Sequence, residues 1–294
     1  MPSTFLKRRL DELYGHFNLS NSVSDPIWIV RRYQRPADQE IAAFIAAALA
    51  FGRVQSVLNS VEGMLAVMGP SPAAYVRAFN PARDRQAFDH LVHRWTRGAD
   101  MAALVWLLHQ MLAQSRSLEG FFVQGLAADA EDIGPAIESF STRALALDAK
   151  AIYGRTTPRP GVAYFFSRPS SGGACKRLNL FLRWMVRHDE VDLGIWPRVR
   201  PGQLIVPLDT HVIRVGRCLR LTRYKSPGWR MAADITRSLR ALDPNDPVKY
   251  DFSICHVGMT NACGLGRGTG DTRCPLVGAC HPGRVRTARR SPRP

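Results

Sequence analysis

The sequence predicts an all-α protein, and two observations support that class. Apolar residues recur with the helical period through nearly every long segment, and no run alternates between apolar and polar residues as a half-buried strand does. With 294 residues, 46% of them hydrophobic, the chain is long enough for one large domain or two ordinary ones with a real core.

Helix candidates follow one another from the N-terminus. The first covers Phe5–His16, and a second opens at Asp38 with apolar residues at the i, i+3, i+4, i+7 and i+8 positions from Ile41. Gly52 and Arg53 interrupt this pattern. Further helices are predicted at Ser56–Met68, Ala73–Phe79, Arg83–His93, Asp100–Ser115, Leu118–Leu126, Glu131–Leu147, Trp229–Leu242 and Pro247–Val257. The polar or proline-rich segments Tyr153–Arg159 and His188–Gln203 are expected to form loops.

Basic residues dominate the charge balance. Lys and Arg number 40 against 24 acidic residues, so the formal net charge is +16. Such an excess usually indicates a polyanionic partner, first of all nucleic acid; a merely basic surface or attachment to acidic membranes are the alternatives. Residues 280–294 contain five arginines and no acidic residue, and this basic tail is expected to be disordered and to contact phosphates non-specifically.

No segment has the pattern of a membrane span or a signal peptide. The longest apolar stretch, Ile41–Phe51, has eleven residues, whereas a membrane span needs about 20. We therefore expect a monomeric protein of the cytoplasm, associated with the nucleoid and without membrane contact. In that compartment the six cysteines are expected to be reduced or bound to metal.

A glycine turn precedes a strongly amphipathic segment in the middle of the chain. Gly172 and Gly173 stand just before Lys176, and the sequence from there to Val186 has a helical pattern. A helix, a glycine turn and a second helix form a helix–hairpin–helix unit, in which backbone N–H groups and the helix dipole bind a phosphate. The alternative is an ordinary turn between two helices.

Lys176 and Asp209 each have a simple interpretation when taken alone. Lys176 is a solvated or phosphate-contacting lysine, and Asp209 is an N-cap, because the periodic residues Val212, Ile213 and Val215 follow it. Together, an amine and a carboxylate beside a phosphate-binding turn are the groups needed to cut a base from DNA.

Two segments resemble a known superfamily. PLDTHVIRVGR at 207–217 resembles the segment with the catalytic aspartate in the helix–hairpin–helix DNA glycosylases, best known through endonuclease III-type enzymes. GGACKRLN at 172–179 resembles the hairpin of that superfamily, with Lys176 at the position of the catalytic lysine and Asn179 at that of the asparagine beyond it. The match continues to DPVKYDFSICHVGM, and the chain is closest to an uncharacterised bacterial branch of the superfamily.

The resemblance implies a two-lobed helix–hairpin–helix glycosylase-like fold with a C-terminal cysteine-rich loop. Residues 38–207 would form one lobe, and residues 1–37 with 208–294 the other, so that Lys176 and Asp209 face each other across a cleft. The chain departs from the superfamily in two places. Ala174 replaces the second hairpin glycine beside an extra Gly173, and an insertion around Asp189–Arg200 lengthens the interval from the lysine to the aspartate.

The implied activity is a DNA N-glycosylase, with or without AP-lyase activity. The target nucleotide is rotated out of the duplex, and Asp209 stabilises positive charge on the sugar as the base leaves. Lys176, once deprotonated, would attack C1′ and allow β-elimination. The base stays open: damaged pyrimidines in base excision repair are the default, and a hypermodified phage cytosine, which would make the protein an antiviral defence factor, is the alternative.

Four cysteines gather near the C-terminus, at Cys255, Cys263, Cys274 and Cys280. By resemblance they would hold a [4Fe–4S] cluster, with zinc or no metal as alternatives. Where the superfamily has its second cysteine, this chain has Asp271, so that either Cys255 or Asp271 would be the fourth ligand.

Contacts to double-stranded DNA are expected from several further residues. The resemblance gives Phe51 the role of the residue that fills the space of the extruded base, and Arg53 a contact to phosphate or to the partner base. The remaining predicted contacts are Gly172, Gly173, Ala174, Arg177, His211 and Arg214. Two other functions stay open: a non-catalytic helix–hairpin–helix module that binds DNA structures, and a zinc-stabilised RNA-binding protein.

Overall fold

The computed structural model describes residues 4–16, 25–155, 160–259 and 274–280. The chain is mostly helical in these ranges, as the sequence predicts. The only β-sheet in the described part is one two-stranded hairpin. No helix in the same ranges is long and apolar enough to cross a membrane.

The first half of the chain builds a group of helices around the long helices α3 and α7. The elements in order are α1 (Thr4–His16), α2 (Ile27–Val30), α3 (Pro36–Ala48), α4 (Val54–Met68), α5 (Pro72–Ala78), α6 (Pro81–Asp84), η2 (Arg85–Phe88), β1 (Val92–His93), β2 (Thr96–Arg97), α7 (Gly98–Ser115), α8 (Leu118–Val123) and α9 (Gly134–Ala146).

The second half contains shorter helices separated by turns. Its elements are α10 (Lys150–Tyr153), α11 (Pro160–Ala163), η3 (Pro169–Ser171), α12 (Lys176–Val186), η4 (Pro201–Gln203), α13 (Thr210–Cys218), α14 (Trp229–Arg240), η5 (Pro247–Tyr250) and α15 (Asp251–Met259).

The segment 81–97 differs most from the sequence-based expectation. In place of one helix over Arg83–His93, the chain forms α6, the 3₁₀ turn η2 and the antiparallel hairpin β1–β2, in which His93 pairs with Thr96. Each strand has only two residues, which is too short for an alternating pattern to be recognised. The prediction of a helix there was wrong.

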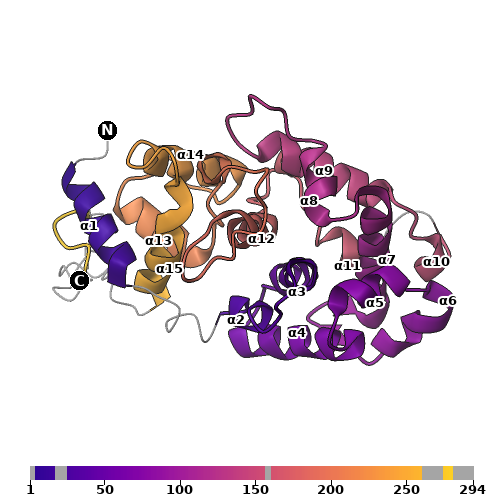
Figure 1. Ribbon diagram of the computed structural model, residues 1–294. Helices are drawn as coiled ribbons and strands as arrows, with labels where there is room; N and C mark the ends of the chain where they lie inside the picture. Colours follow the sequence, from indigo (N-terminus) through magenta and orange to yellow (C-terminus); the bar gives the residue numbers. More distant parts are fainter. Residues whose placement is uncertain (1–3, 17–24, 156–159, 260–273, 281–294) are drawn as a thin grey trace, which may run out of the picture.

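Helix α12 lies in the middle of the molecule (Figure 1). It packs against α3 on one side, and α13, α14, α15 and α1 lie on the other. Helix α1 is far from these last helices in sequence but packs against α15 and η5, where the hydroxyl of Tyr250 donates a hydrogen bond of 2.7 Å to Asp11. Helix α2 packs against α3, although the sequence groups residues 1–37 with residues 208–294.

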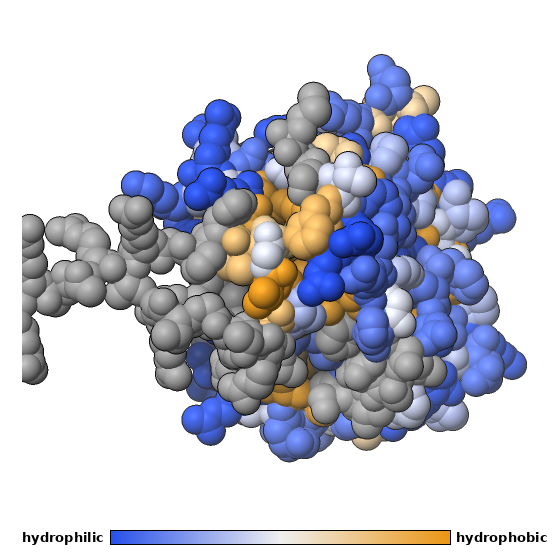
Figure 2. Space-filling view, turned by 90° about the vertical axis from the view of Figure 1, so that its left-hand side faces the viewer, coloured by the Kyte–Doolittle hydropathy of each residue, from blue (hydrophilic) through white to orange (hydrophobic). Residues whose placement is uncertain are grey.

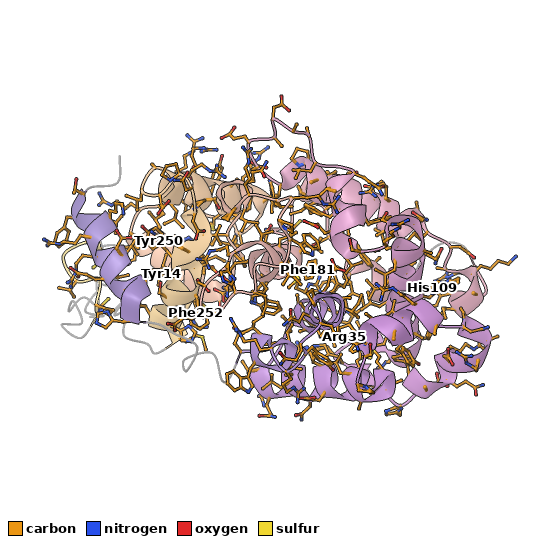
Figure 3. The ribbon with its side chains drawn as sticks, viewed as in Figure 1. Tyr14, Arg35, His109, Phe181, Tyr250 and Phe252 are labelled. Atoms are coloured by element: carbon orange, nitrogen blue, oxygen red, sulfur yellow. The ribbon has the colours of Figure 1, made fainter. Side chains whose placement is uncertain are left out.

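The core joins these groups through aromatic side chains. Phe181 of α12 lies at the centre of the molecule beside α3 (Figure 3), and its ring meets that of Phe44 edge-on at 5.1 Å. Trp196 meets Phe181 in the same way at 5.2 Å and donates its indole N–H to the buried carboxylate of Glu40 at 2.8 Å. Helix α12 is therefore held in a fixed position relative to α3.

The end of the molecule that carries α1 presents an apolar patch bordered by hydrophilic residues (Figure 2). Phe5 of α1 and Val277 are large apolar residues that are exposed in this part of the chain. A Cβ atom added at Gly278 would lie 3.5 Å from Cζ of Phe5, so segment 274–280 packs directly against α1.

Candidate functional site

The glycine turn before α12 is anchored on both sides. Gly172 has a left-handed backbone with φ of 80°, which glycine adopts without strain. The hydroxyl and the backbone N–H of Ser170 donate to Glu138 of α9 at 2.7 and 2.9 Å. The carbonyl of Gly172 accepts from the N–H of Trp229 at 3.2 Å. The turn is thus fixed between α9 and the first residue of α14.

This turn leaves several backbone donors exposed at the start of α12. Within the described ranges, the N–H groups of Gly173 and Ala174 have no hydrogen-bond acceptor, and the Cys175 side chain does not cap the helix. Gly172 and Gly173 are exposed to solvent. Unpaired N–H groups at the N-terminus of an eleven-residue helix form a site that an anion such as a phosphate can occupy.

Asp209 is the N-cap of α13, as its position before the periodic residues predicts. Its Oδ1 accepts hydrogen bonds from the backbone N–H groups of His211 and Val212, at 2.8 and 2.7 Å. Its Oδ2 accepts a hydrogen bond from the thiol of Cys255 on α15, at a sulfur–oxygen distance of 3.2 Å. Both oxygens are therefore held, and the carboxylate is half-buried.

Lys176, the first residue of α12, is half-buried and makes no hydrogen bond or ion pair with the rest of the described chain. Its charge nevertheless acts on Cys255. Burial raises the pKa of the Cys255 thiol far above its ordinary value, Asp209 and Asp251 raise it further, and Lys176 lowers it. The thiol of Cys255 thus joins α15 to the start of α13 through Asp209.

A buried ion-pair network holds α12 against α15. Arg183 donates to Asp251 at 2.7 Å and to Asp192 at 3.1 Å, and all three side chains are nearly inaccessible to solvent. Burial raises the pKa of Asp251 to about 6; Arg183 opposes this increase, and the nearby Asp209 adds to it. Because removing either partner would leave a buried charge uncompensated, the two helices cannot easily separate at this point.

The insertion after α12 is held by a second part of the network. Arg187 pairs with Asp189 and with Asp246, each at 2.8 Å. Burial alone would raise the pKa of Asp189, but Arg187 and backbone N–H groups hold it at about 2. Arg31 donates to the carbonyls of Val191 and Glu190 at 3.1 and 2.5 Å. The inserted segment is therefore rigidly attached to α12 and α2.

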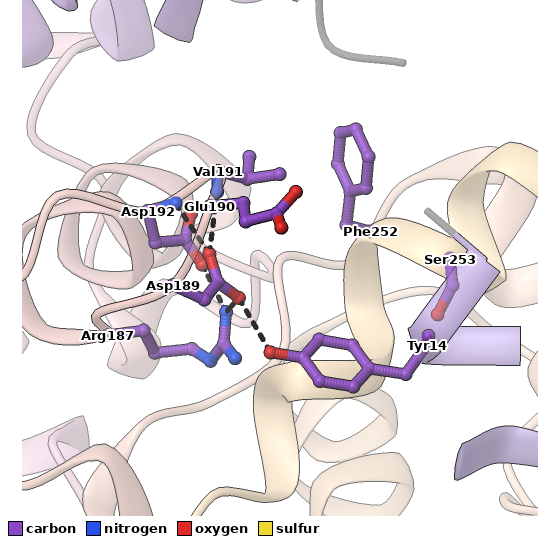
Figure 4. Close-up of a pocket in the computed structure, with 9 residues that line it drawn as sticks. Tyr14, Arg187, Asp189, Glu190, Val191, Asp192, Phe252 and Ser253 are labelled. Carbon is purple, nitrogen blue, oxygen red and sulfur yellow. Dashed lines mark hydrogen bonds and ion pairs between the residues drawn. The ribbon is translucent and has the colours of Figure 1, made fainter. Parts of the chain in front are cut away.

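A cavity of about 230 Å³ lies beside this insertion (Figure 4). Its wall includes the carboxylates of Asp189, Glu190 and Asp192 but only one cation, Arg187, so it does not suit a phosphate. Arg187 follows the last residue of α12, whereas Lys176 is the first, and the helix between them is about 16 Å long. The cavity therefore lies away from the amine. Its remaining lining residues are Tyr14, Gly15, Val191, Phe252 and Ser253.

The other residues predicted to contact DNA have different surroundings. Arg53 is exposed at the N-cap of α4. Phe51 and His211 are half-buried, and Arg214 donates to the carbonyl of Gly258 on α15. Arg177 is only 8% exposed, and its guanidinium donates to the carbonyls of Tyr164 and Ala48. Burial lowers the pKa of Arg177 to about 10. Arg177 thus faces the protein interior, in contrast to the expected phosphate contact.

The cysteine cluster is only partly within the described residues. Cys274 is buried and Cys280 half-buried in segment 274–280, whereas Cys263, Asp271 and the basic tail after Cys280 lie outside the described ranges. No group of three or more metal-binding side chains occurs in the described ranges. The thiol of Cys255 on α15 donates its proton to Asp209 at a sulfur–oxygen distance of 3.2 Å.

Two features of the site were not predicted from the sequence. The partnership of Cys255 with Asp209 depends on α15 crossing α13, and no local pattern indicates it. The exposed aromatic residue Trp95, on the β1–β2 turn, was missed together with the hairpin. The dipeptide Arg94-Trp95, between residues that pair as strands, is the signal that could have drawn attention to it.

The chain belongs to the family described as protein of unknown function (DUF2400). The family model matches residues 25–260, which include the glycine turn, Lys176, Asp209 and Cys255. No curated protein and no solved structure matches the chain. The matched range contains the whole described site but ends before Cys263, Cys274 and Cys280.

Proposed function

We propose that this protein is a DNA N-glycosylase that removes a damaged or modified base after flipping it out of the duplex. One observation carries the proposal: the carboxylate of Asp209 is fixed at both oxygens, by the backbone N–H groups at the start of α13 and by the thiol of Cys255 on α15. The unpaired N–H groups of the turn before α12 and the net charge of +16 add support for a DNA substrate.

The roles of the two residues follow from their chemistry. As the C1′–N bond breaks, its electron pair leaves with the base, and the negative charge of Asp209 stabilises the positive sugar. In the glycosylase route, water adds to C1′ and one of its protons goes to the departing base, which leaves an abasic site. In the lyase route, the deprotonated amine of Lys176 adds to C1′ instead, and the C1′–O4′ bond opens to give a Schiff base. Loss of a proton from C2′ then expels the 3′ phosphate and breaks the C3′–O bond.

The proposal includes a structural [4Fe–4S] cluster in the C-terminal loop. Cys263, Cys274 and Cys280 would be three of its ligands, and Asp271, not Cys255, would be the fourth. Such a cluster would fix a basic loop against phosphates and take no part in the chemistry. The proposed partner is double-stranded DNA at the nucleoid, in repair or in defence against phage DNA with modified bases.

The decisive variant is Asp209→Asn. Asparagine caps a helix as well as aspartate does, so this change removes the negative charge while α13 keeps its cap. Purified protein is incubated with DNA from varied sources, including phage DNA with modified bases, and freed bases, abasic sites and strand breaks are measured. We expect the wild type to release a base and Asp209→Asn to bind the same DNA but release none.

Lys176 is tested in the same reactions by borohydride trapping. The wild type is expected to crosslink to DNA through the Schiff base, and Lys176→Gln is not. Base release without any crosslink would leave a glycosylase without lyase activity. If the wild type frees no base from any DNA, the protein is a binding module and the proposal is wrong. If Asp209→Asn frees the base at the wild-type rate, the role proposed for Asp209 is wrong.

A further inference from the structure

Three aromatic side chains from separate segments form one partly exposed surface next to the start of α12. They are Phe51 from the turn between α3 and α4, Trp95 from the β1–β2 turn, and Tyr164 after α11. Ring centroids lie 5.0 Å apart for Phe51 and Trp95, 5.0 Å for Trp95 and Tyr164, and 5.1 Å for Phe51 and Tyr164. Trp95 is 51% exposed and Tyr164 38% exposed. We call these three residues the aromatic surface.

The aromatic surface is rigid although it is partly open to solvent. Beneath it, Nε2 of His93 donates a hydrogen bond to the carbonyl of Phe51 at 2.9 Å. Nδ1 of the same ring is hydrogen-bonded to the hydroxyl of Ser60 on α4, also at 2.9 Å. The hydroxyl of Thr96 donates to the carbonyl of His93 at 2.6 Å, which braces the hairpin. Burial, the largest cause, lowers the pKa of His93. A surface whose side chains are already fixed loses little entropy when it binds a flat partner.

Basic residues surround the aromatic surface. Arg53, Arg94 and Arg97 are all exposed, and the segment from Leu91 to Arg97 has no carboxylate. The guanidinium carbon of Arg94 lies 5.8 Å from the centre of the Trp95 ring. Exposed rings among cations complement a strand that has flat bases and negative phosphates, and a purely apolar protein partner would not need the arginines.

The position of the aromatic surface connects it to the proposed amine. The guanidinium carbon of Arg177 lies 3.5 Å above the Tyr164 ring and 5.2 Å from the centre of the Phe51 ring. Arg177 is the residue after Lys176, so the aromatic surface adjoins the N-terminus of α12 and its unpaired N–H groups. A strand whose phosphate occupied that N-terminus would have its neighbouring bases within reach of the rings.

We propose that the aromatic surface stacks against the unpaired bases of a locally opened DNA duplex, with Trp95 as the main contact. The sequence assigned a related role to Phe51, but Phe51 is half-buried, whereas Trp95 is 51% exposed. Stacking on an aromatic residue does not depend on base identity, so this surface recognises opened DNA and not a particular sequence. The inference rests on the DNA-binding part of the proposed function and not on base release.

The test compares two duplexes that differ at one position. One contains a tetrahydrofuran abasic analogue opposite a purine, so that the purine is unpaired, and the other is fully paired; binding is followed by fluorescence anisotropy. Wild-type protein is expected to prefer the opened duplex, and Trp95→Ala to lose affinity for it on the order of ten-fold while binding to the paired duplex changes little. Trp95→Phe keeps a ring and is expected to retain most of the preference.

Trp28→Ala is the matched control, because Trp28 is also an exposed tryptophan, 42% accessible, but lies on α2. The control is expected to bind both duplexes like the wild type, and thermal unfolding establishes that each variant is folded. The inference is overturned if Trp95→Ala keeps the preference, if Trp28→Ala loses it equally, or if single-stranded RNA binds more tightly than the opened duplex.

The outcomes separate this inference from the proposed function. Wild-type protein that binds no DNA would overturn both. DNA binding that is indifferent to Trp95 would overturn the aromatic surface alone. If Trp95→Ala loses the preference and no DNA loses a base, the inference about the aromatic surface is supported and the proposed glycosylase activity is wrong.

Discussion

Asp209 has two structural tasks, one for each carboxylate oxygen. Oδ1 caps α13 through two backbone N–H groups, and Oδ2 receives the thiol proton of Cys255. A carboxylate held at both oxygens has little freedom to rotate, and fixed charges stabilise a developing cation without the cost of reorganisation. At the residue scale, we therefore propose that Cys255 positions Asp209, which would leave Asp271 as the fourth ligand of the proposed cluster.

This assignment predicts the iron content of two cysteine variants. Cys255→Ser keeps a donor to Asp209 and is expected to leave iron and acid-labile sulfide unchanged in protein purified without oxygen. Cys280→Ser removes one of the proposed ligands and is expected to lower both. If Cys255→Ser loses as much iron as Cys280→Ser, Cys255 is a ligand of the cluster.

At the element scale, the glycine turn depends on an unusually close contact. A Cβ atom at Gly228 would lie 2.6 Å from the carbonyl oxygen of Gly172, closer than real contacts allow. Gly228 is therefore needed because α14 begins directly against the turn. The contact holds the turn directly against the start of α14.

We predict that Gly228→Ala destabilises the protein by about 1–3 kcal/mol, because the turn or α14 must move to accept the methyl group. Gly173→Ala is the matched control within the same contact region, since its nearest neighbour would be the hydroxyl of Ser171 at 3.9 Å. Urea unfolding measures both. Equal stability of the two variants would show that the turn is not held by α14.

The helices were predictable to the extent that they show a periodic pattern. The expected helix at Phe5–His16 is α1, and the N-cap role of Asp209 is confirmed. The hairpin at 92–97 was not predictable, because it depends on distant segments: His93 of β1 is hydrogen-bonded to Ser60 of α4, and β2 packs against α7. The prediction for Pro247–Val257 merged a 3₁₀ turn with α15, since both have apolar residues at similar spacing.

The residues of the candidate site were likewise predictable only where the local sequence indicates them. Lys176 and Asp209 were identified by residue type and neighbours; the structure places Asp209 in contact with Cys255 and Lys176 at the first position of α12. The exposed position expected for Arg177 could not be tested from sequence, because its direction depends on the carbonyls of Ala48 and Tyr164, which lie far away in the chain.

At the scale of the whole molecule, the excess of 16 positive charges favours any long polyanion. Part of the excess is paired inside the protein: Arg183 and Arg187 are buried with carboxylates and are not available to a strand. The five arginines after residue 280 belong to the segment outside the described ranges and add charge without belonging to the site.

Removing residues 281–294 is therefore expected to change binding strength but not base choice. The slope of the logarithm of the binding constant against the logarithm of salt concentration should become less steep, by about 4.5 at most for five arginines. Anisotropy titrations at several salt concentrations measure this slope. A shortened chain with an unchanged slope would exclude the tail from DNA contact.

One feature of the structure links the outer surface to the site beneath it. The guanidinium of Arg177 is bonded to the carbonyl of Tyr164 and lies on its ring, while its backbone directly follows Lys176. Arg177 therefore ties Tyr164 to the stretch of backbone that carries Lys176. Under the proposed function, a strand that displaced Tyr164 would also displace the first turn of α12, where Lys176 lies.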